Sequence, residues 1–246
     1  MHYIDHSVAL LQQAAAHAPA AFSTSLGLED MVLTDLIARH APSISLFTLD
    51  TGRLHPETLA LVAEAEARYK MRIAVYVPQT AALEHYIRLN GINGFYDSIS
   101  QRQDCCAVRK VEPLRRALAG KRAWVTGLRR EQAASRAALT ATAFDAEYQL
   151  IKFNPLLDWT LADLETYIAV HQVPVNRLHA SGYPSIGCAP CTRPIARGED
   201  ARAGRWWWES ADQKECGLHV ACAPSAQATL QTNAPATSHT NAAALT

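Results

Sequence analysis

Short apolar runs alternate with amphipathic stretches through the first two thirds of the chain. The apolar runs, each of which predicts a buried strand, are residues 20–25, 43–49, 73–77, 124–127 and, less clearly, 148–153. Helical periodicity marks the segments between them, chiefly 29–40, 56–69 and 81–89. Strands separated by helices are typical of βαβ units. We therefore predict an α/β fold whose mostly parallel sheet carries helices on both faces.

Three loops directly follow predicted strands, at residues 23–30, 50–54 and 126–136. Ligands of parallel sheets bind beyond the carboxyl ends of the strands, so these loops are candidate parts of a site. The first loop offers hydroxyls and Gly27 at the start of a helix, which suits a phosphate or sulfate group, although an ordinary strand–helix turn is the alternative. Between 121 and 136, five basic residues accompany one acid, which favours an anionic ligand or a plain charged surface.

The pattern changes from about residue 154. Thr160, with Asp163 three residues later, resembles a capping box and predicts a helix that runs to about residue 170. Glycine and proline then become frequent, which predicts an irregular segment that contains the second cysteine pair. From residue 223 onward the chain holds no Asp, Glu, Lys or Arg and is mostly alanine and small polar residues. We expect residues 223–246 to be a disordered tail.

Composition narrows the class of protein. The chain has 246 residues, of which 49% are hydrophobic and 19% charged, and this excludes a largely disordered or collagen-like protein. Its formal net charge is +0, so bulk charge does not favour binding to nucleic acid or to an acidic membrane. The sequence has no apolar run of about 18 residues that would span a membrane, and its first residues lack a signal-peptide pattern. We expect a cytoplasmic protein that binds neither nucleic acid nor membrane.

Four of the six cysteines form two pairs that could share one centre. Cys105 and Cys106 are adjacent, and Cys188 and Cys191 form a C-x-x-C sequence. In a chain without a visible leader, reduced thiols are more typical than disulfides. Adjacent cysteines strain a tetrahedral zinc site, whereas a cubane iron–sulfur cluster offers each thiolate a separate iron. An iron–sulfur cluster, a zinc site and a buried structural pair beside a chance C-x-x-C all remain open on this pattern.

Cationic residues accompany both the first cysteine pair and a tryptophan run. Arg109 and Lys110 follow the adjacent cysteines, where they could stabilise a negatively charged cluster or form a solvated helix face. Arg202 and Arg205 precede three consecutive tryptophans at 206–208 and could share one face. Three consecutive tryptophans cannot all enter one core, so we expect some of them to pack against another element.

Cys216 is a candidate nucleophile near the end of the chain. It precedes Gly217 and lies close to Lys214 and His219 in a short segment. Nearby cations lower the pKa of a thiol and raise its thiolate fraction. The alternative is an incidental surface thiol.

Taken together, these residues resemble the assimilatory adenylyl-sulfate (APS) reductases, the thioredoxin-dependent iron–sulfur type of the PAPS/APS reductase family. The resemblance covers about residues 20–222. Its motifs are S-T-S-L-G-L-E-D at 23–30, L-D-T-G-R-L at 49–54, C-C-A-V-R-K at 105–110, V-T-G-L-R-R at 125–130, C-A-P-C at 188–191, the Arg–Trp run at 202–208 and E-C-G-L-H at 215–219. The resemblance implies a Rossmann-like adenine nucleotide α-hydrolase fold with an irregular C-terminal segment. It also implies one reductase domain over 1–222, a mobile catalytic segment at about 195–222, and a homo-oligomer.

The resemblance assigns roles to individual residues. It implies that Cys105, Cys106, Cys188 and Cys191 hold a [4Fe–4S] cluster and that Cys216 is the nucleophile. The serine-rich loop would contact the phosphosulfate, the region of Leu49 the adenosine, and the C-terminal arginines the anionic end of the substrate. The implied substrate-binding residues are Ser23, Ser25, Gly27, Leu49, Lys110, Gly127, Arg129, Arg202, Arg205 and His219.

The implied reaction is the reduction of adenosine 5'-phosphosulfate to sulfite and AMP, in sulfate assimilation and cysteine biosynthesis. It would pass through an S-sulfocysteine on Cys216, which thioredoxin then reduces. The alternative is a 3'-phosphoadenylyl-sulfate reductase or a dual-substrate enzyme. The paired cysteines favour the unphosphorylated nucleotide, whereas Arg129, Arg130 and Arg136 keep dual use open.

Two hypotheses from other classes are weaker. An ATP-pyrophosphatase-type enzyme usually carries an S-G-G-x-D-S loop, and the chain has Gly27-Leu28-Glu29-Asp30 at that place. A nonenzymatic iron–sulfur or zinc module, such as a redox sensor, would leave Cys216 unexplained.

Overall fold

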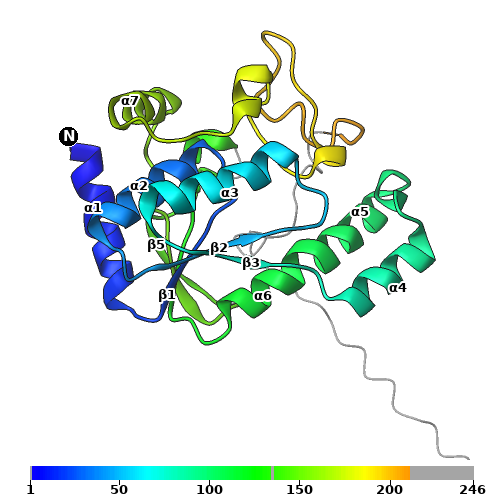
Figure 1. The fold of residues 1–246 in the computed structure, drawn as a ribbon, viewed down its shortest axis with the longest axis horizontal. Helices are drawn as coiled ribbons and strands as arrows, with labels where there is room; N and C mark the ends of the chain where they lie inside the picture. The colour runs from blue at the N-terminus through cyan, green and yellow to red at the C-terminus, as the bar shows by residue number, and fades with distance from the viewer. Residues whose placement is uncertain (1, 134–135, 211–246) are drawn as a thin grey trace, which may run out of the picture.

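The computed structural model describes residues 2–133 and 136–210, and within them a six-stranded sheet has the order β3-β2-β1-β4-β6-β5 (Figure 1). The strands are β1 (Ala20–Ser23), β2 (Ser45–Leu49), β3 (Ile73–Tyr76), β4 (Ala123–Val125), β5 (Thr142–Asp145) and β6 (Leu150–Phe153). Neighbouring strands pair in parallel except β5, which runs antiparallel to β6 at one edge. The predicted mostly parallel sheet is confirmed.

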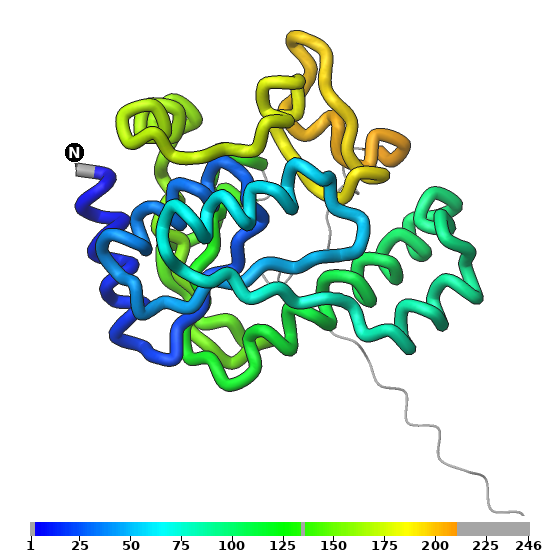
Figure 2. Tube along the Cα trace, viewed as in Figure 1, coloured from blue at the N-terminus to red at the C-terminus, as the bar shows by residue number. Residues whose placement is uncertain are grey.

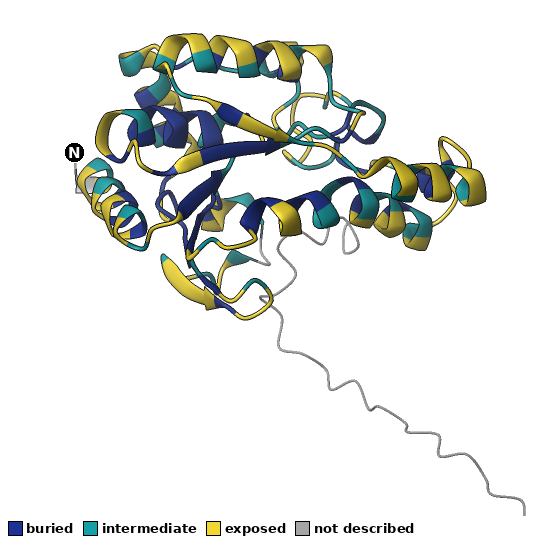
Figure 3. Ribbon diagram, turned by 60° about the horizontal axis from the view of Figure 1, so that its bottom comes forward, coloured by how far each residue is buried: buried dark blue, intermediate teal, exposed yellow. Residues whose placement is uncertain are grey.

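Helices cover both faces of this sheet. The helices are α1 (His2–Ala16), α2 (Leu28–His40), α3 (Pro56–Tyr69), α4 (Thr80–Asn90), α5 (Ile99–Cys106), α6 (Glu112–Leu118) and α7 (Leu161–His171). The larger core packs α1, α2, α3 and α7 against one face and includes Phe22 and Val125. The smaller core packs α6 against the other face and includes Ala21 and Trp124. Successive strand residues thus bury on opposite faces, and Figure 3 shows the central strands buried.

Residues 99–118 form one continuous helix in which the turn Ala107–Val111 is π-helical. Pro113 has no N–H to donate to the carbonyl four residues earlier, and a wider turn is one way in which a helix absorbs such a break. The helix carries Cys105 and Cys106 immediately before this turn and Lys110 inside it. π-Helical turns are frequent at functional sites. The first cysteine pair and Lys110 are therefore positioned by the same element.

Three elements go beyond those that the sequence pattern predicts: α1, the helix over 99–118, and β5. β5 exposes the side chains of Thr142, Ala143 and Phe144, so it lacks the apolar run of a buried strand. The predicted capping box is confirmed, because Thr160 Oγ1 accepts from the Asp163 N–H at 3.1 Å and Asp163 accepts from the Thr160 N–H at 2.8 Å. Among the described helices, none has the length and apolar character needed to cross a bilayer.

The segment after α7, residues 172–210, is irregular, as predicted, and lies beside the loop after β2 and the helix α5 (Figure 2). Its backbone hydrogen bonds lie mostly in tight turns, and the longer-range ones include Trp206 N–H to the Cys191 carbonyl at 3.1 Å and Arg193 N–H to the Gly204 carbonyl at 3.0 Å. The predicted mobile part and the predicted tail extend past residue 210, outside the described residues. The division into a domain at 1–222 and a tail stays a prediction.

A buried ion pair fastens this segment to α5. Arg102 donates to both carboxylate oxygens of Glu209, at 2.9 and 2.8 Å. The side chains of the two residues are 1% and 3% exposed. The Arg102 guanidinium also lies 4.9 Å from the ring centre of Trp206, and the Arg205 guanidinium lies 4.8 Å from the same ring. The last described residues are therefore fixed to α5 at Arg102, three residues before Cys105.

We predict that Glu209→Gln lowers the free energy of unfolding by about 3 kcal/mol, because it leaves the buried Arg102 charge uncompensated. For a domain of this size, the loss lowers Tm by about 6 °C or more. Calorimetry or thermal unfolding by circular dichroism measures the shift.

Glu199→Gln is the matched control on the same segment. It removes the ion pair between Glu199 and Arg193, whose side chains are 35% and 36% exposed, respectively. Exposed pairs contribute about 0–1 kcal/mol. Equal shifts in Tm for the two variants would contradict the anchoring role of Arg102 and Glu209.

Candidate functional site

A cavity of about 930 Å³ lies where β1, β2 and β4 end. Its walls come from the loops after these three strands and from the irregular segment, so all three loops predicted from the sequence contribute to it. The predicted substrate-binding residues that the structure describes all line this cavity: Ser23, Ser25, Gly27, Leu49, Lys110, Gly127, Arg129, Arg202 and Arg205. Cys216 and His219 lie outside the described residues.

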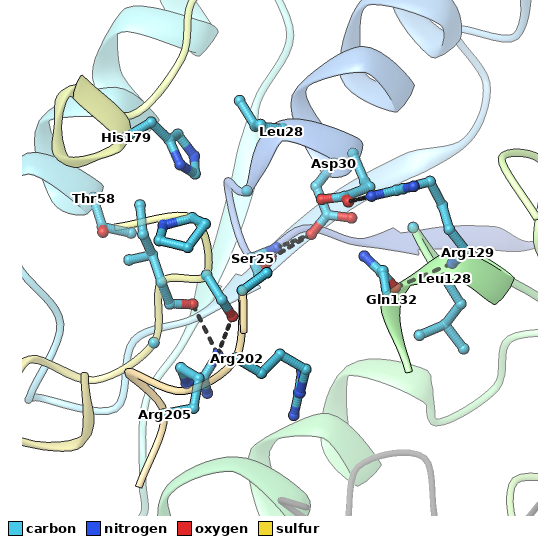
Figure 4. A pocket seen from close by; sticks show the side chains of 18 of the residues that line it. Ser25, Leu28, Asp30, Thr58, Leu128, Arg129, Gln132, His179, Arg202 and Arg205 are labelled. Carbon is cyan, nitrogen blue, oxygen red and sulfur yellow. Dashed lines mark hydrogen bonds and ion pairs between the residues drawn. The ribbon is translucent and has the colours of Figure 1, made fainter. Parts of the chain in front are cut away.

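The serine-rich loop is closed on itself by Asp30. The Ser25 N–H and hydroxyl both donate to one Asp30 oxygen, at 2.5 and 2.6 Å (Figure 4). Burial raises the pKa of Asp30 to about 6, although these two bonds act in the opposite direction. A Cβ on Gly127 would lie 2.1 Å from the Asp30 carboxylate, so glycine is required where the loops after β1 and β4 meet. The Ser25 hydroxyl shapes the loop through Asp30, and its predicted contact with substrate stays a prediction.

Arg129 is held by carboxylates of the cavity wall. Its guanidinium donates to Glu29 at 2.9 Å and to Glu131 at 2.7 Å, and its side chain is 6% exposed. Arg130 pairs with Asp158. Two arginines of the basic cluster predicted from the sequence are thus already neutralised by protein carboxylates, and the anion-binding role of Arg129 stays a prediction.

Arg202 and Arg205 both reach the cavity from the irregular segment (Figure 4). Arg205 donates to the Ser185 hydroxyl and to the Ile186 carbonyl, each at 3.2 Å. A Cβ on Gly187 would come within 2.6 Å of the Arg205 guanidinium, so this glycine provides the space that the arginine occupies. The predicted common placement of the two arginines is present in the fold.

The fold brings the two cysteine pairs together. Cys105, Cys106, Cys188 and Cys191 are free thiols, and all are buried except Cys105, which is partly buried. Cys105, Cys188 and Cys191 belong to a small apolar cluster with Phe95, Trp206 and Trp208, separate from the two main cores. Cys106 lies close enough to Cys191 to influence its titration. Trp207 instead points outward with 40% exposure, as expected for a run that cannot enter one core.

The thiols differ in their electrostatic surroundings. Burial, together with the neighbouring cysteines, raises the pKa of Cys191 to about 12. Burial alone would also raise the pKa of Cys188. The positive charge of Lys110 and a hydrogen bond of 3.2 Å with the Thr51 hydroxyl are the main opposing effects, and the pKa of Cys188 is lowered below its ordinary value. Lys110 acts on both thiols and also lines the cavity. It therefore faces the cysteine cluster and the cavity together.

The donor set fits an iron–sulfur cluster. Four thiols gather in one buried region with Arg109 and Lys110 at its edge, where cations offset the negative charge of such a cluster. In the described ranges, no group of three or more His, Cys, Asp or Glu side chains converges as a site for a single metal ion. A cubane cluster does not need convergence on one atom, because each thiolate binds a different iron.

Several residues of the site were missed by sequence reasoning. The sequence predicts Arg109 as a cation beside the cysteines, but not its bond to the Thr51 carbonyl at 2.5 Å, which joins the cysteine helix to the loop after β2. His179 lines the cavity and belongs to none of the sequence motifs. Arg102 and Glu209 are 107 residues apart, so no local pattern indicates their pairing. Asp30 and Arg109 lie inside sequence motifs, whereas His179, Arg102 and Glu209 carry no local signal.

Comparison with known proteins identifies the family of the chain. The sequence model of the phosphoadenosine phosphosulfate reductase domain matches residues 19–194. An adenosine 5'-phosphosulfate reductase of Allochromatium vinosum is 58% identical over 80% of this chain and 77% of its own length. A protein of the same name from Burkholderia cepacia is 52% identical over 86% of this chain and 84% of its own.

Solved structures agree as well. The phosphoadenylyl-sulfate reductase of Candida auris, in a phosphate complex, superposes with a TM-score of 0.66 and 30% identity over 77% of this chain and 96% of its own. The FMN adenylyltransferase of Candida glabrata reaches a TM-score of 0.53 at 16% identity over 80% of this chain and 68% of its own, which shows a shared fold alone. The predicted adenine nucleotide α-hydrolase-like fold is confirmed. The chain belongs to the phosphoadenosine phosphosulfate reductase domain family.

Proposed function

We propose that this protein reduces adenosine 5'-phosphosulfate to sulfite and AMP, in sulfate assimilation and cysteine biosynthesis. Relatives of 58% and 52% identity bear the name adenosine 5'-phosphosulfate reductase. One observation carries the proposal: the cavity wall includes Cys188, which is one of the four thiols, and Lys110, whose charge acts on that thiol. A nucleotide in the cavity would thus lie beside a cysteine centre and a cation.

The proposed chemistry has two steps and begins with Cys216. Its thiolate attacks the sulfur of the phosphosulfate, the bond from that sulfur to the phosphate oxygen breaks, and AMP leaves with the electron pair. The product on the enzyme is an S-sulfocysteine. A thiolate of reduced thioredoxin then attacks the Cys216 sulfur and releases sulfite, and the second thioredoxin thiol resolves the mixed disulfide. The two electrons come from the dithiol.

Cationic side chains would favour the first step. Lys110, Arg202 and Arg205 reach the cavity from two different elements. Negative charge grows on the departing phosphate, and preorganised cations stabilise charge that develops in a transition state. Arg205 is held in place by Ser185 and by the ring of Trp206, so its guanidinium is oriented before substrate binds.

Cys105, Cys106, Cys188 and Cys191 would hold a [4Fe–4S] cluster. When bound, the cluster supplies charge and fixed geometry beside the cavity, and the net reaction takes its electrons from thiols. Lys110 offsets negative charge on the cysteine side while it contacts the cavity side. This double placement supports a positioning role for Lys110.

The choice between the two nucleotides follows from charge. A 3'-phosphate brings added negative charge, and two of the arginines that could compensate it already form ion pairs with protein carboxylates. Arg129 pairs with Glu29 and Glu131, and Arg130 pairs with Asp158. These pairs support the unphosphorylated nucleotide, while the likeness to the Candida auris enzyme keeps the 3'-phosphorylated one as the alternative. Thioredoxin as reductant, a cytoplasmic location and a homo-oligomer complete the proposal.

We predict that Cys216→Ser loses sulfite formation by about 10³-fold or more, because a serine hydroxyl stays protonated and cannot form the intermediate. The measurement is anaerobic turnover with reduced thioredoxin, with each nucleotide supplied separately and sulfite followed. Cys222→Ser, a neighbouring thiol without an assigned role, is the control and should retain activity. Turnover by Cys216→Ser would sink the mechanism, and sulfite from the 3'-phosphorylated nucleotide alone would overturn the substrate.

A second prediction concerns the four thiols. Cys191→Ser is expected to lose most of the bound iron, which should be about four per chain in the parent protein, together with visible absorbance. Iron and acid-labile sulfide analysis of the anaerobically purified protein measures this. Cys222→Ser again serves as control, and a Cys191→Ser protein with a full iron content would rule out the ligand assignment.

A third prediction separates Lys110 from the cluster. Lys110→Ala should keep the iron content and lower kcat by about 10²-fold, because a cation close to the reacting groups is lost. Lys121→Ala is the matched control, since Lys121 bonds to Ser45 at the opposite end of the strands. An unchanged kcat in Lys110→Ala would remove the proposed link between cysteine centre and substrate.

A further inference from the structure

His179 lines the cavity, and the proposed reaction does not use it. It lies in the short 3-10 turn Arg177–Ser181, which Asn176 caps by accepting from the Leu178 N–H at 3.1 Å. Gly182, with φ of +83°, ends the turn, and its N–H donates to the His179 carbonyl at 3.2 Å. The backbone around the imidazole is thus fixed by the turn. Figure 4 shows the ring directed from this turn toward the cavity, which Thr58 and Leu28 also line.

The hydrogen bonds of the ring define its tautomer. His179 Nδ1 lies 2.8 Å from the Tyr183 carbonyl oxygen. A carbonyl oxygen only accepts, so Nδ1 carries the hydrogen. Burial lowers the pKa of His179 below its ordinary value, so the ring is neutral near pH 7. In a neutral imidazole whose Nδ1 is protonated, Nε2 bears a lone pair and acts as an acceptor.

Nε2 of His179 is buried and has no hydrogen-bond partner among the residues that the structure describes. A buried acceptor without a donor costs about 1–3 kcal/mol, so such atoms normally pair with water or with a ligand. His179 is among the residues that line the cavity, so a molecule that fills the cavity can supply the donor once a small shift of the ring or the wall uncovers Nε2. Since Nε2 is an acceptor, its partner must offer an N–H or an O–H group.

We propose that His179 Nε2 accepts a hydrogen bond from the nucleoside part of the bound nucleotide, an assignment that rests on the proposed function. Phosphate and sulfate groups carry acceptor oxygens and negative charge, so a neutral acceptor cannot serve them. An adenosine nucleotide offers donors only at its exocyclic amine and its ribose hydroxyls. His179 is therefore a substrate-contacting residue at the nucleoside end, and the cations Arg202 and Arg205 serve the anionic end.

Two substitutions separate the two ring nitrogens. His179→Asn keeps an N–H near the Nδ1 position for the Tyr183 carbonyl but removes the acceptor at Nε2. His179→Gln places an amide oxygen near the Nε2 position. We expect the Kd of AMP, measured by calorimetry on the full chain, to rise about fivefold in His179→Asn, the effect of one lost hydrogen bond. We expect His179→Gln to recover part of the affinity.

Nucleotide analogues identify the donor. IMP lacks the exocyclic amine, and 2'-deoxy-AMP and 3'-deoxy-AMP each lack one ribose hydroxyl. The analogue that lacks the donor should bind the parent protein more weakly than AMP but bind His179→Asn about as well as AMP does, because the two changes remove the same bond. If none of the analogues shows this coupling, Nε2 pairs with water only and the proposal is wrong.

His55 provides the matched control. It is another half-buried histidine with a buried, unpartnered Nε2, and its ring lies 5.6 Å from the ring of Tyr183, but it is not among the residues that line the cavity. His55→Asn should leave the Kd of AMP unchanged. Equal weakening in His55→Asn and His179→Asn would assign the effect to the loop around Tyr183 and overturn the proposal.

The outcomes distinguish this inference from the proposed function. If the parent protein binds AMP and forms sulfite while His179→Asn binds AMP normally, the contact of His179 is wrong and the reductase function stands. If the parent protein neither binds AMP nor forms sulfite, the function itself fails, and the inference fails with it.

Discussion

The site depends on the buried ion pair between Arg102 and Glu209. The cavity wall opposite the sheet is an irregular segment whose backbone hydrogen bonds lie mostly in tight turns, so no long helix or strand spans it. A buried pair contributes little net stability, but breaking it is costly, because an unpaired charge would remain inside the protein. We therefore expect the pair to favour one docked geometry, together with the backbone bridge between Leu54 and Cys188. In that geometry Cys188 and Cys191 meet the cysteines of α5, and Arg205 faces the cavity.

The cysteine cluster and the cavity form one electrostatic unit. Lys110 acts on two thiols and lines the cavity, and Arg109 bonds to the carbonyl of Thr51, whose hydroxyl contacts Cys188. Because interactions between charges are stronger away from bulk water, a change in charge on either side is felt on the other. The π-helical turn places Lys110 on this boundary, only a few residues from Cys106. The chemistry of both sides is thus set by one helix.

The sequence predicts what depends on local pattern and misses what depends on distant partners. The strands at the centre are apolar on both sides, so β1, β2 and β4 and the loops that follow them can be recognised from composition alone. β5 exposes Phe144 and has no such pattern. The motifs locate the cavity walls, but they do not indicate that Arg129 is paired with Glu29, 100 residues away. Such pairs form only when the sheet brings separate loops to one edge.

The cavity carries cations and a neutral acceptor at different residues, and under the proposed function this difference would give the substrate a direction. Arg202, Arg205 and Lys110 supply positive charge, which suits a phosphosulfate. His179 supplies a neutral acceptor, which suits the donors of a nucleoside. A reversed nucleotide would place phosphate oxygens against the His179 lone pair and leave the arginines without an anion. Binding in one orientation would lower the barrier to reaction, because it would hold the sulfur of the phosphosulfate at the cationic end of the cavity. Under the proposed function, the groups that bind the nucleotide would therefore also decide which of its atoms meets the nucleophile.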